Sequence, residues 1–443
     1  MTDRLAVVFL LGVASAIVYK VVEWWAMRRQ EGWWAQRWPT SIRTTGQITT
    51  ALAETEERHR HLMAEIEERR QRMSQILEDL PTPRRQRELT QAGEAAQKEE
   101  RWPEALAAYE KALALTQEAE GRAALLNSIA QCRLALGEKH AALASFAAAV
   151  AAAPRLAQAH NNYANLLGNM GRREEAETHY KEALEIDPRD ALAHNNYANL
   201  LKDMGRWEEV EGRYQAALDI DPRFALAHYN YAILLAETGR REAAETHYQA
   251  ALEIDPRYAP AHNSYANLLG NMGRREEAEG HYRAALEIDP RYAPAHYNYA
   301  LFLRDMGRRE EAEGHYRAAL EIDPRLAPAH NNYAILLKDV GRREEAETHY
   351  QAALEIDPRL APAHNNYANL LSDMGRREEA EGHYQAALEL FQAQGRGKEV
   401  ETVRRNLKIL AAAAQGGEPV LPLKLEMLPP EPVYERALAV AGR

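Results

Sequence analysis

Asparagine is the residue type whose number and spacing in this chain indicate a binding chemistry. Asn162, Asn196 and Asn230 are successive members of a series with a period of 34 residues, within segments such as HNNYANLL. Each amide offers two hydrogen-bond donors and a carbonyl acceptor. A regular column of amides would pair with the backbone of an extended peptide whatever its sequence. The alternative interpretation is that the amides are solvated or bond adjacent helices.

Histidine recurs with the same period, at two places represented by His160 and His179. Such a count would suit a metal ion or a pH switch. Because one of these places is a packing position and the other repeats with the whole unit, we expect packing residues. The sequence predicts no metal site and no cofactor.

Motifs for catalysis are missing from the sequence. It contains no glycine-rich phosphate loop, nucleophile elbow or HExxH motif, and its acidic residues recur with the repeat, which favours surface roles. The single cysteine, Cys132, excludes an intrachain disulfide and a zinc site built from several cysteines. A net charge of −11 argues against a nucleic-acid partner. We therefore expect a protein that is not an enzyme.

The elements that position these side chains follow from regularly spaced glycines and prolines. Between Gly171 and Gly205, and between Pro188 and Pro222, the spacing is again 34 residues. In the unit that starts at Ala157, we predict one helix over 158–170 and a second over 173–186. Gly171 suits a left-handed C-cap, and proline cannot continue a helix. Strands are not expected, because alanine, leucine, glutamate and arginine dominate.

This pattern resembles the tetratricopeptide repeat (TPR) family. The matching positions are His160, Tyr163, Ala164, Leu167, Gly171, Ala176, Tyr180, Ala183 and Pro188. Histidine replaces the family's aromatic residue at the first of them, and Ala164 stands where glycine is usual. The resemblance implies an all-α solenoid, a right-handed superhelix of helix-turn-helix repeats.

Eight clear repeats fill residues 123–394, starting at 123, 157, 191, 225, 259, 293, 327 and 361. A degenerate repeat over 86–119 precedes them, and a three-residue insertion follows it. We predict a capping helix over 398–414 and a flexible tail over 415–443. Repeat positions are numbered from the first residue of each repeat, so Ala157 is position 1.

In TPR proteins the first helix of each repeat lines a concave groove, and the resemblance places the asparagines there. The array is similar to the asparagine ladder in the TPR superhelix of O-GlcNAc transferases. The predicted peptide-binding residues are Asn162, Asn165, Asn196, Asn199, Tyr229, Asn230, Ile233, Asn267, Tyr297, Asn298, Leu301, Arg304, Asn332, Ile335, Asn366 and Asn369. Apolar and aromatic members, such as Tyr229 and Leu301, would receive a hydrophobic anchor of a partner. Acidic residues at position 13 favour basic partners.

The N-terminal region, residues 1–38, has the character of a membrane anchor. Residues 5–22 form an apolar run with one charge, and five tryptophans and three arginines follow it by residue 38. The arginines place the bulk of the chain in the cytoplasm. Two alternatives stay open: a signal peptide cleaved near residue 16, which would make the protein periplasmic or secreted, and a buried helix.

Between anchor and repeats we predict a linker over 39–48 and a helical spacer over 49–80. The apolar stripe of the spacer is a weak coiled-coil seam. It favours either a homodimeric stalk or a single amphipathic helix.

Together these features predict a membrane-anchored scaffold that binds an extended segment of a protein partner in the concave groove. Two alternatives are a self-assembling structural coat and a regulatory subunit of a separately encoded enzyme.

Overall fold

The computed structural model describes residues 57–58, 60–69 and 82–414, and it contains helices and no strands in these ranges. The chain divides into two compact units, Met1–Gln91 and Ala92–Arg443. The predicted anchor, linker and tail, with most of the spacer, lie outside the described residues. No helix in the described ranges is long and apolar enough to cross a bilayer.

In the first unit the described part of the spacer is helical, over residues 57–58 and 60–69. An exposed ion pair joins Arg69 and Glu65, one helical turn apart, at 2.5 Å. These residues agree with the helix predicted for 49–80.

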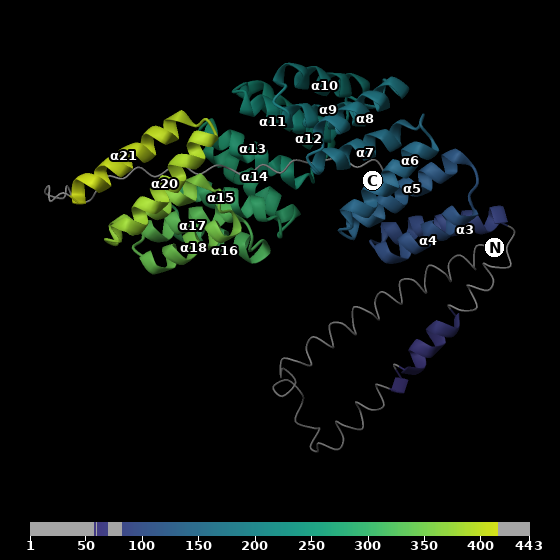
Figure 1. Ribbon diagram of the computed structural model, residues 1–443, viewed down its shortest axis with the longest axis horizontal. Coiled ribbons are helices and arrows are strands. Elements are labelled where there is room, and N and C mark those ends of the chain that lie inside the picture. The colour runs from purple at the N-terminus through teal and green to yellow at the C-terminus, as the bar shows by residue number, and fades with distance from the viewer. Residues whose placement is uncertain (1–56, 59, 70–81, 415–443) are drawn as a thin grey trace. The chain divides into compact units, whose positions relative to one another are not determined.

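The second unit is a succession of helices that pair along the chain (Figure 1). Their bounds are α3 Thr82–Lys98, in which the boundary between the units falls, α4 Trp102–Leu115, α5 Ala119–Ala135, α6 Lys139–Ala152, α7 Ala157–Asn169, α8 Arg173–Ile186, α9 Ala191–Asp203, α10 Trp207–Ile220, α11 Ala225–Glu237, α12 Arg241–Ile254, α13 Ala259–Asn271, α14 Arg275–Ile288, α15 Ala293–Asp305, α16 Arg309–Ile322, α17 Ala327–Asp339, α18 Arg343–Ile356, α19 Ala361–Asp373, α20 Arg377–Ala393 and α21 Gly397–Ala414.

The predicted helix boundaries are confirmed to within one residue in the unit starting at Ala157. The reason is backbone chemistry: Gly171 adopts a φ of +79°, the left-handed conformation that glycine tolerates best. The corresponding glycines of the other repeats do the same. The first helices of the two repeats predicted to start at 86 and 123 begin four residues earlier, α3 at Thr82 and α5 at Ala119. Pro83 lies in the first turn of α3, where a missing N–H costs nothing, and the inserted residues extend α5.

Small side chains let the two helices of a repeat pack closely. Ala164, Ala176 and Ala183 are completely buried, and the same holds at their counterparts along the array. Val210 replaces alanine at position 20 of one repeat and is also completely buried. In the degenerate repeat, a Cβ at Gly93 would lie 2.6 Å from the Tyr109 ring, so glycine is required there.

Successive repeats are joined on two sides. The first helices contact one another directly, as α7 does α9 and α13 does α15. On the other side, Glu177 of the second helix α8 accepts hydrogen bonds from two residues of the next repeat, Tyr197 at 2.8 Å and Arg206 at 2.6 Å. Although burial opposes it, hydrogen bonds from Lys181, Arg206 and Tyr197 lower the pKa of Glu177 to about 2.

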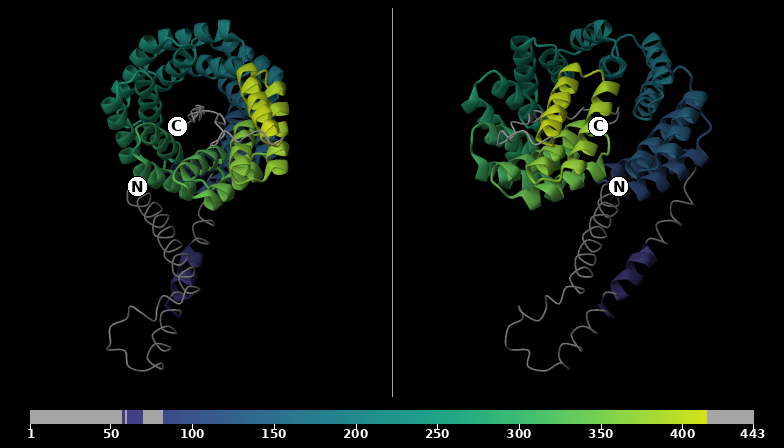
Figure 2. Two further views of the ribbon diagram at one scale, coloured as in Figure 1. Left: turned by 90° about the vertical axis from the view of Figure 1, so that its left-hand side faces the viewer. Right: turned by 60° about the vertical axis from the view of Figure 1, so that its left-hand side comes forward.

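Equivalent ties recur along the array, whose repeats follow one another around a common axis (Figure 2). Arginine at position 16 bonds glutamate at position 21 of the preceding repeat in the pairs Arg240–Glu211, Arg274–Glu245, Arg308–Glu279, Arg342–Glu313 and Arg376–Glu347. These arginine and glutamate side chains therefore link neighbouring repeats.

The residues predicted to form the cap are helical and belong to α21. Val403 and Leu410 of this helix are buried against the last repeat. Asn406 is completely buried and donates from Nδ2 to Asn365 Oδ1 at 3.0 Å. The cap therefore contributes both apolar and polar contacts to the final repeat.

Candidate binding surface

The asparagines at position 6 form a hydrogen-bonded ladder between repeats. Each donates from Nδ2 to the side chain at position 5 of the preceding repeat. The asparagine rungs are Asn162 to Asn127 at 2.9 Å, Asn196 to Asn161 at 3.3 Å, Asn230 to Asn195 at 3.0 Å, Asn298 to Asn263 at 3.2 Å and Asn366 to Asn331 at 3.3 Å.

Burial decides which interpretation of these amides the structure supports. All six predicted side chains at position 6 are between 0% and 3% exposed. The first helices contact each other directly, so positions 5 and 6 lie between them rather than on an open face. The amides at position 6 bond adjacent helices, which was the alternative interpretation of the column.

The asparagines at position 9 are held by tyrosines of the same repeat. Tyr214 donates to Asn199 at 2.5 Å, Tyr282 to Asn267 at 2.6 Å and Tyr384 to Asn369 at 2.5 Å. Tyr180 donates to Asn165 in the same way. Each of these pairs joins the first helix of a repeat to the second.

Tyr229 and Tyr297 were expected to offer aromatic surface, and this expectation is wrong. Both are completely buried and take the place of asparagine in the ladder. Asn332 donates to the Tyr297 hydroxyl at 2.7 Å, and the Tyr229 hydroxyl lies 3.3 Å from Ser264 Oγ. A tyrosine side chain is longer than an asparagine side chain. Opposite Tyr229, position 6 is the shorter Ser264 in place of asparagine.

Ile233, Leu301 and Ile335 replace asparagine at position 9 and are also buried. An apolar side chain offers no acceptor to the tyrosine of its repeat. The buried hydroxyls of Tyr316 and Tyr350 accordingly have no hydrogen-bond partner among the described residues. The polar interior is therefore incomplete in the repeats starting at 293 and 327.

Arg304 lies in the same part of the array, and its side chain is 13% exposed. Nη2 donates to Asp305 at 3.1 Å, while Nη1 is buried without a partner in the described part of the chain. At the same position 12, Lys202 pairs with Glu237 at 2.6 Å and Lys338 with Asp373 at 2.9 Å. Two carboxylates of the predicted acidic stripe are thus neutralised by lysine.

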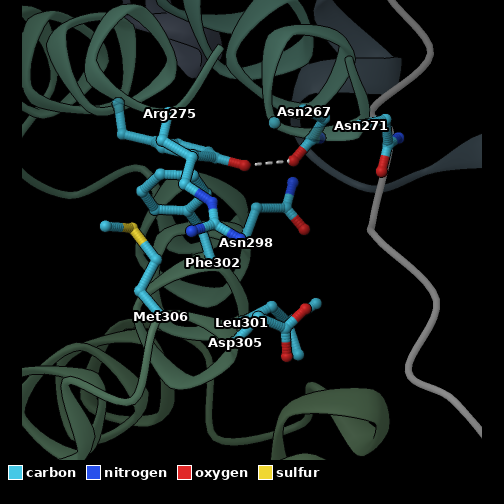
Figure 3. A pocket seen from close by; sticks show the side chains of 10 residues that line it. Asn267, Asn271, Arg275, Asn298, Leu301, Phe302, Asp305 and Met306 are labelled. Carbon is cyan, nitrogen blue, oxygen red and sulfur yellow. Dashed lines mark hydrogen bonds between the residues drawn. The ribbon is translucent and has the colours of Figure 1, made fainter. Parts of the chain in front are cut away.

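A pocket of about 260 Å³ opens between the repeats starting at 259 and 293. Side chains from α13, α14 and α15 surround it (Figure 3). Three predicted groove residues line it: Asn267, Asn298 and Leu301. The other lining residues are Gly270, Asn271, Arg275, Tyr282, Phe302, Asp305 and Met306.

Two departures from the repeat pattern could have revealed this pocket in the sequence. Position 12 is Gly270, whereas most other repeats have a larger side chain there. Position 10 is Phe302 in the next repeat, where six of the other seven clear repeats have leucine and the first has Cys132. A Cβ at Gly270 would lie 3.5 Å from the Phe302 ring, so the two residues are close neighbours.

The chain belongs to the tetratricopeptide repeat family. Family models match residues 155–221, 223–289, 291–359 and 325–393, which is more than half of the chain, and also residues 89–123. The second match covers the repeat identified as degenerate. A TPR array is an interaction scaffold, and the partner that it implies is a protein.

Three solved structures are similar to the chain at low sequence identity. The Cut9–Hcn1 hetero-tetramer of the APC/C matches at 14% identity with a TM-score of 0.51, covering 68% of this chain and 59% of that one. Pseudomonas aeruginosa pilF matches at 21% identity with a TM-score of 0.42, over 49% of this chain and 99% of its own. YrrB, a TPR protein with an unusual peptide-binding site, matches at 23% identity with a TM-score of 0.32, over 40% of this chain and 92% of its own. No curated protein matches the chain in sequence.

Proposed function

We propose that this protein is a non-catalytic scaffold that binds an extended segment of a protein partner along the first helices of its repeats. The observation that carries the proposal is the pocket at Asn267, Asn298 and Leu301. Pockets that enclose a small-molecule ligand occupy roughly 300–1,000 Å³. At about 260 Å³, this one suits a side chain or two of a longer segment.

The lining of the pocket indicates the chemistry of the anchor. Leu301, Phe302 and Met306 supply apolar contact, while Asn271 and Asp305 are exposed polar neighbours. An apolar anchor with polar groups beside it matches this arrangement, as at other interfaces where one buried side chain supplies much of the affinity. The ladder asparagines then set the spacing of the repeats, and the binding contacts come from positions 9, 10 and 13.

A capture experiment with the full chain tests the pocket. Leu301→Asn and Phe302→Leu each introduce the residue that most other repeats carry at that position, so both preserve the fold. Ile233→Asn makes the same change at position 9 in a repeat outside the pocket and is the matched control.

We expect partner capture, measured by quantitative mass spectrometry, to fall at least tenfold for the two pocket variants and to stay unchanged for the control. Equal capture by all three variants would refute the pocket as the anchor site. Light scattering that shows growth in size with concentration would support a self-assembling coat instead.

We further propose that residues 5–22 anchor the scaffold in a membrane, with the repeats in the cytoplasm. The support is the apolar run and the tryptophans and arginines that follow it. Deletion of residues 1–22 should move the protein from the membrane to the supernatant fraction of lysed cells. A signal peptide would instead give a shortened mature chain, visible by intact mass.

A further inference from the structure

Six repeats contain a pair of histidines in direct contact. The position 4 and position 23 rings face each other through Nδ1 atoms separated by 2.8–3.1 Å. The pairs are His160–His179, His228–His247, His262–His281, His296–His315, His330–His349 and His364–His383.

A backbone contact fixes which nitrogen of the first histidine can act as a ligand. His160 Nε2 lies 3.1 Å from the carbonyl oxygen of Pro154, which can only accept. Nε2 therefore carries a proton, and in the neutral ring Nδ1 presents a lone pair. Metal-ligating histidines are oriented by the same kind of hydrogen bond to a carbonyl.

Glu182 makes the first of these pairs different from the other five. Its Oε2 lies 2.9 Å from His160 Nδ1 and 2.7 Å from His179 Nδ1. At the same position 26 the other five repeats have alanine, the residues being Ala250, Ala284, Ala318, Ala352 and Ala386. Within the described residues, these three side chains form one group whose ligand atoms all lie within 4.8 Å of one another.

Hydrogen bonding alone leaves this group unsatisfied when both rings are neutral. One proton on the position 23 ring completes a pair in the other five repeats. In the first pair, His179 Nδ1 has a single proton for two neighbouring acceptors, His160 Nδ1 and Glu182 Oε2. No proton lies between these two acceptors, which are 2.9 Å apart and repel each other. A cation placed among the three atoms would remove the repulsion.

We propose that His160, His179 and Glu182 bind a divalent zinc ion between α7 and α8. Two imidazole nitrogens and a carboxylate oxygen are ligands that zinc prefers, at about 2.0–2.2 Å. Ligands of a tetrahedral ion at that distance lie about 3.3 Å apart, so the three side chains separate by only a few tenths of an ångström. Glu182 is 44% exposed, which gives the ion access and leaves a fourth position for water.

This proposal differs from the sequence analysis, which predicted no metal site. All six pairs have the same two histidines, so the histidines alone do not single out one pair. The residue that distinguishes this site is Glu182, one of many glutamates in the chain. Comparison of position 26 across the repeats shows the signal, since Glu182 replaces alanine beside a histidine pair in one repeat alone.

The array provides variants that its own repeats show to be tolerated. Glu182→Ala recreates the side chain present in the five other pairs. His179→Arg recreates the residue at position 23 of the repeat starting at 191, where Arg213 stands over the Tyr197 ring at 4.9 Å. Ala284→Glu introduces the third ligand beside His262 and His281.

Zinc titration of the full-length, untagged chain by isothermal calorimetry tests the proposal, with circular dichroism to confirm that each variant is folded. We expect one strong site per chain, at least tenfold weaker in Glu182→Ala and His179→Arg, and two strong sites in Ala284→Glu. Zinc binding that is unaffected by Glu182→Ala, or no strong site in the unchanged chain, would overturn the proposal; a shared proton would then link the three side chains.

Discussion

The repeats starting at 157 and 191 and those starting at 293 and 327 have matching helices and different interiors. In the first two, asparagine at position 9 accepts a hydrogen bond from the tyrosine of the second helix, as in the Tyr214–Asn199 pair. In the other two, Leu301 and Ile335 replace the asparagine, and the hydroxyls of Tyr316 and Tyr350 are buried without a partner among the described residues. Arg304 adds a half-satisfied guanidinium to this region.

This difference teaches which positions maintain the array and which are free to vary. The left-handed glycines and the prolines after the second helices are the same in both regions, and so are the buried alanines apart from the one that Val210 replaces, so the course of the backbone is conserved. A solenoid repeat contacts only its neighbours, and its stability is shared among them. One or two repeats can therefore lose interior hydrogen bonds while the array stays folded, and one of the two changed repeats, that starting at 293, lines the pocket.

Truncation at position 5 should have its largest effect in the region with the incomplete interior. Tyr297→Ala removes a completely buried ring and should cost about 3–5 kcal/mol. Asn195→Ala removes only hydrogen bonds, to Asn196 and Asn230, and should cost about 1–3 kcal/mol. Hydrogen exchange of the backbone amides in the affected repeats measures the loss of stability in each variant. Equal losses would contradict the expected difference between the two regions.

Exchange of the residues at position 9 should produce a smaller and asymmetric effect. Asn199→Leu leaves the buried Tyr214 hydroxyl without its acceptor, which should cost about 1–3 kcal/mol. Ile335→Asn loses apolar burial but gives the Tyr350 hydroxyl an acceptor, so we expect a net change within about 1 kcal/mol.

Tyr214→Phe provides the control for this pair. It removes the hydroxyl that Asn199→Leu strands, so the double variant should be more stable than Asn199→Leu alone. If the two single changes simply add, the hydrogen bond has no part in the difference between the regions.

Local backbone rules made the helices predictable, whereas the environment of each side chain depends on the neighbouring repeat. Gly171 and Pro188 mark helix ends through their own conformations, so sequence placed α7 and α8 within a residue. Asn162 carries no mark that distinguishes a groove from an interface between repeats. Its hydrogen bond reaches Asn127, 35 residues away, and only the packing of α5 against α7 brings them together. Of the predicted groove residues, Asn267, Asn298 and Leu301 meet in one pocket.

Mild acid should weaken the two regions unequally, and this is the smallest of the expected effects. Burial and then a neighbouring histidine lower the pKa of His315 and of His349 to about 4, and burial also lowers the pKa of His296 and His330. The repeat starting at 191 has one such group, His194.

The direction follows from linkage. Unfolded histidine has a pKa of about 6.5, so these folded, neutral rings contribute stability above that pH. The contribution is lost as the pH falls from about 6.5 toward about 4. Since the rings are partly exposed, the loss is on the order of 1 kcal/mol for each pair. The protection of backbone amides against hydrogen exchange, corrected for the intrinsic rate at each pH, should therefore fall more between pH 6.5 and 5 in α15–α18 than in α9 and α10. Replacing both position 23 histidines, His315→Arg with His349→Arg, should remove most of this excess, and an excess that persists would place its origin outside the histidine pairs.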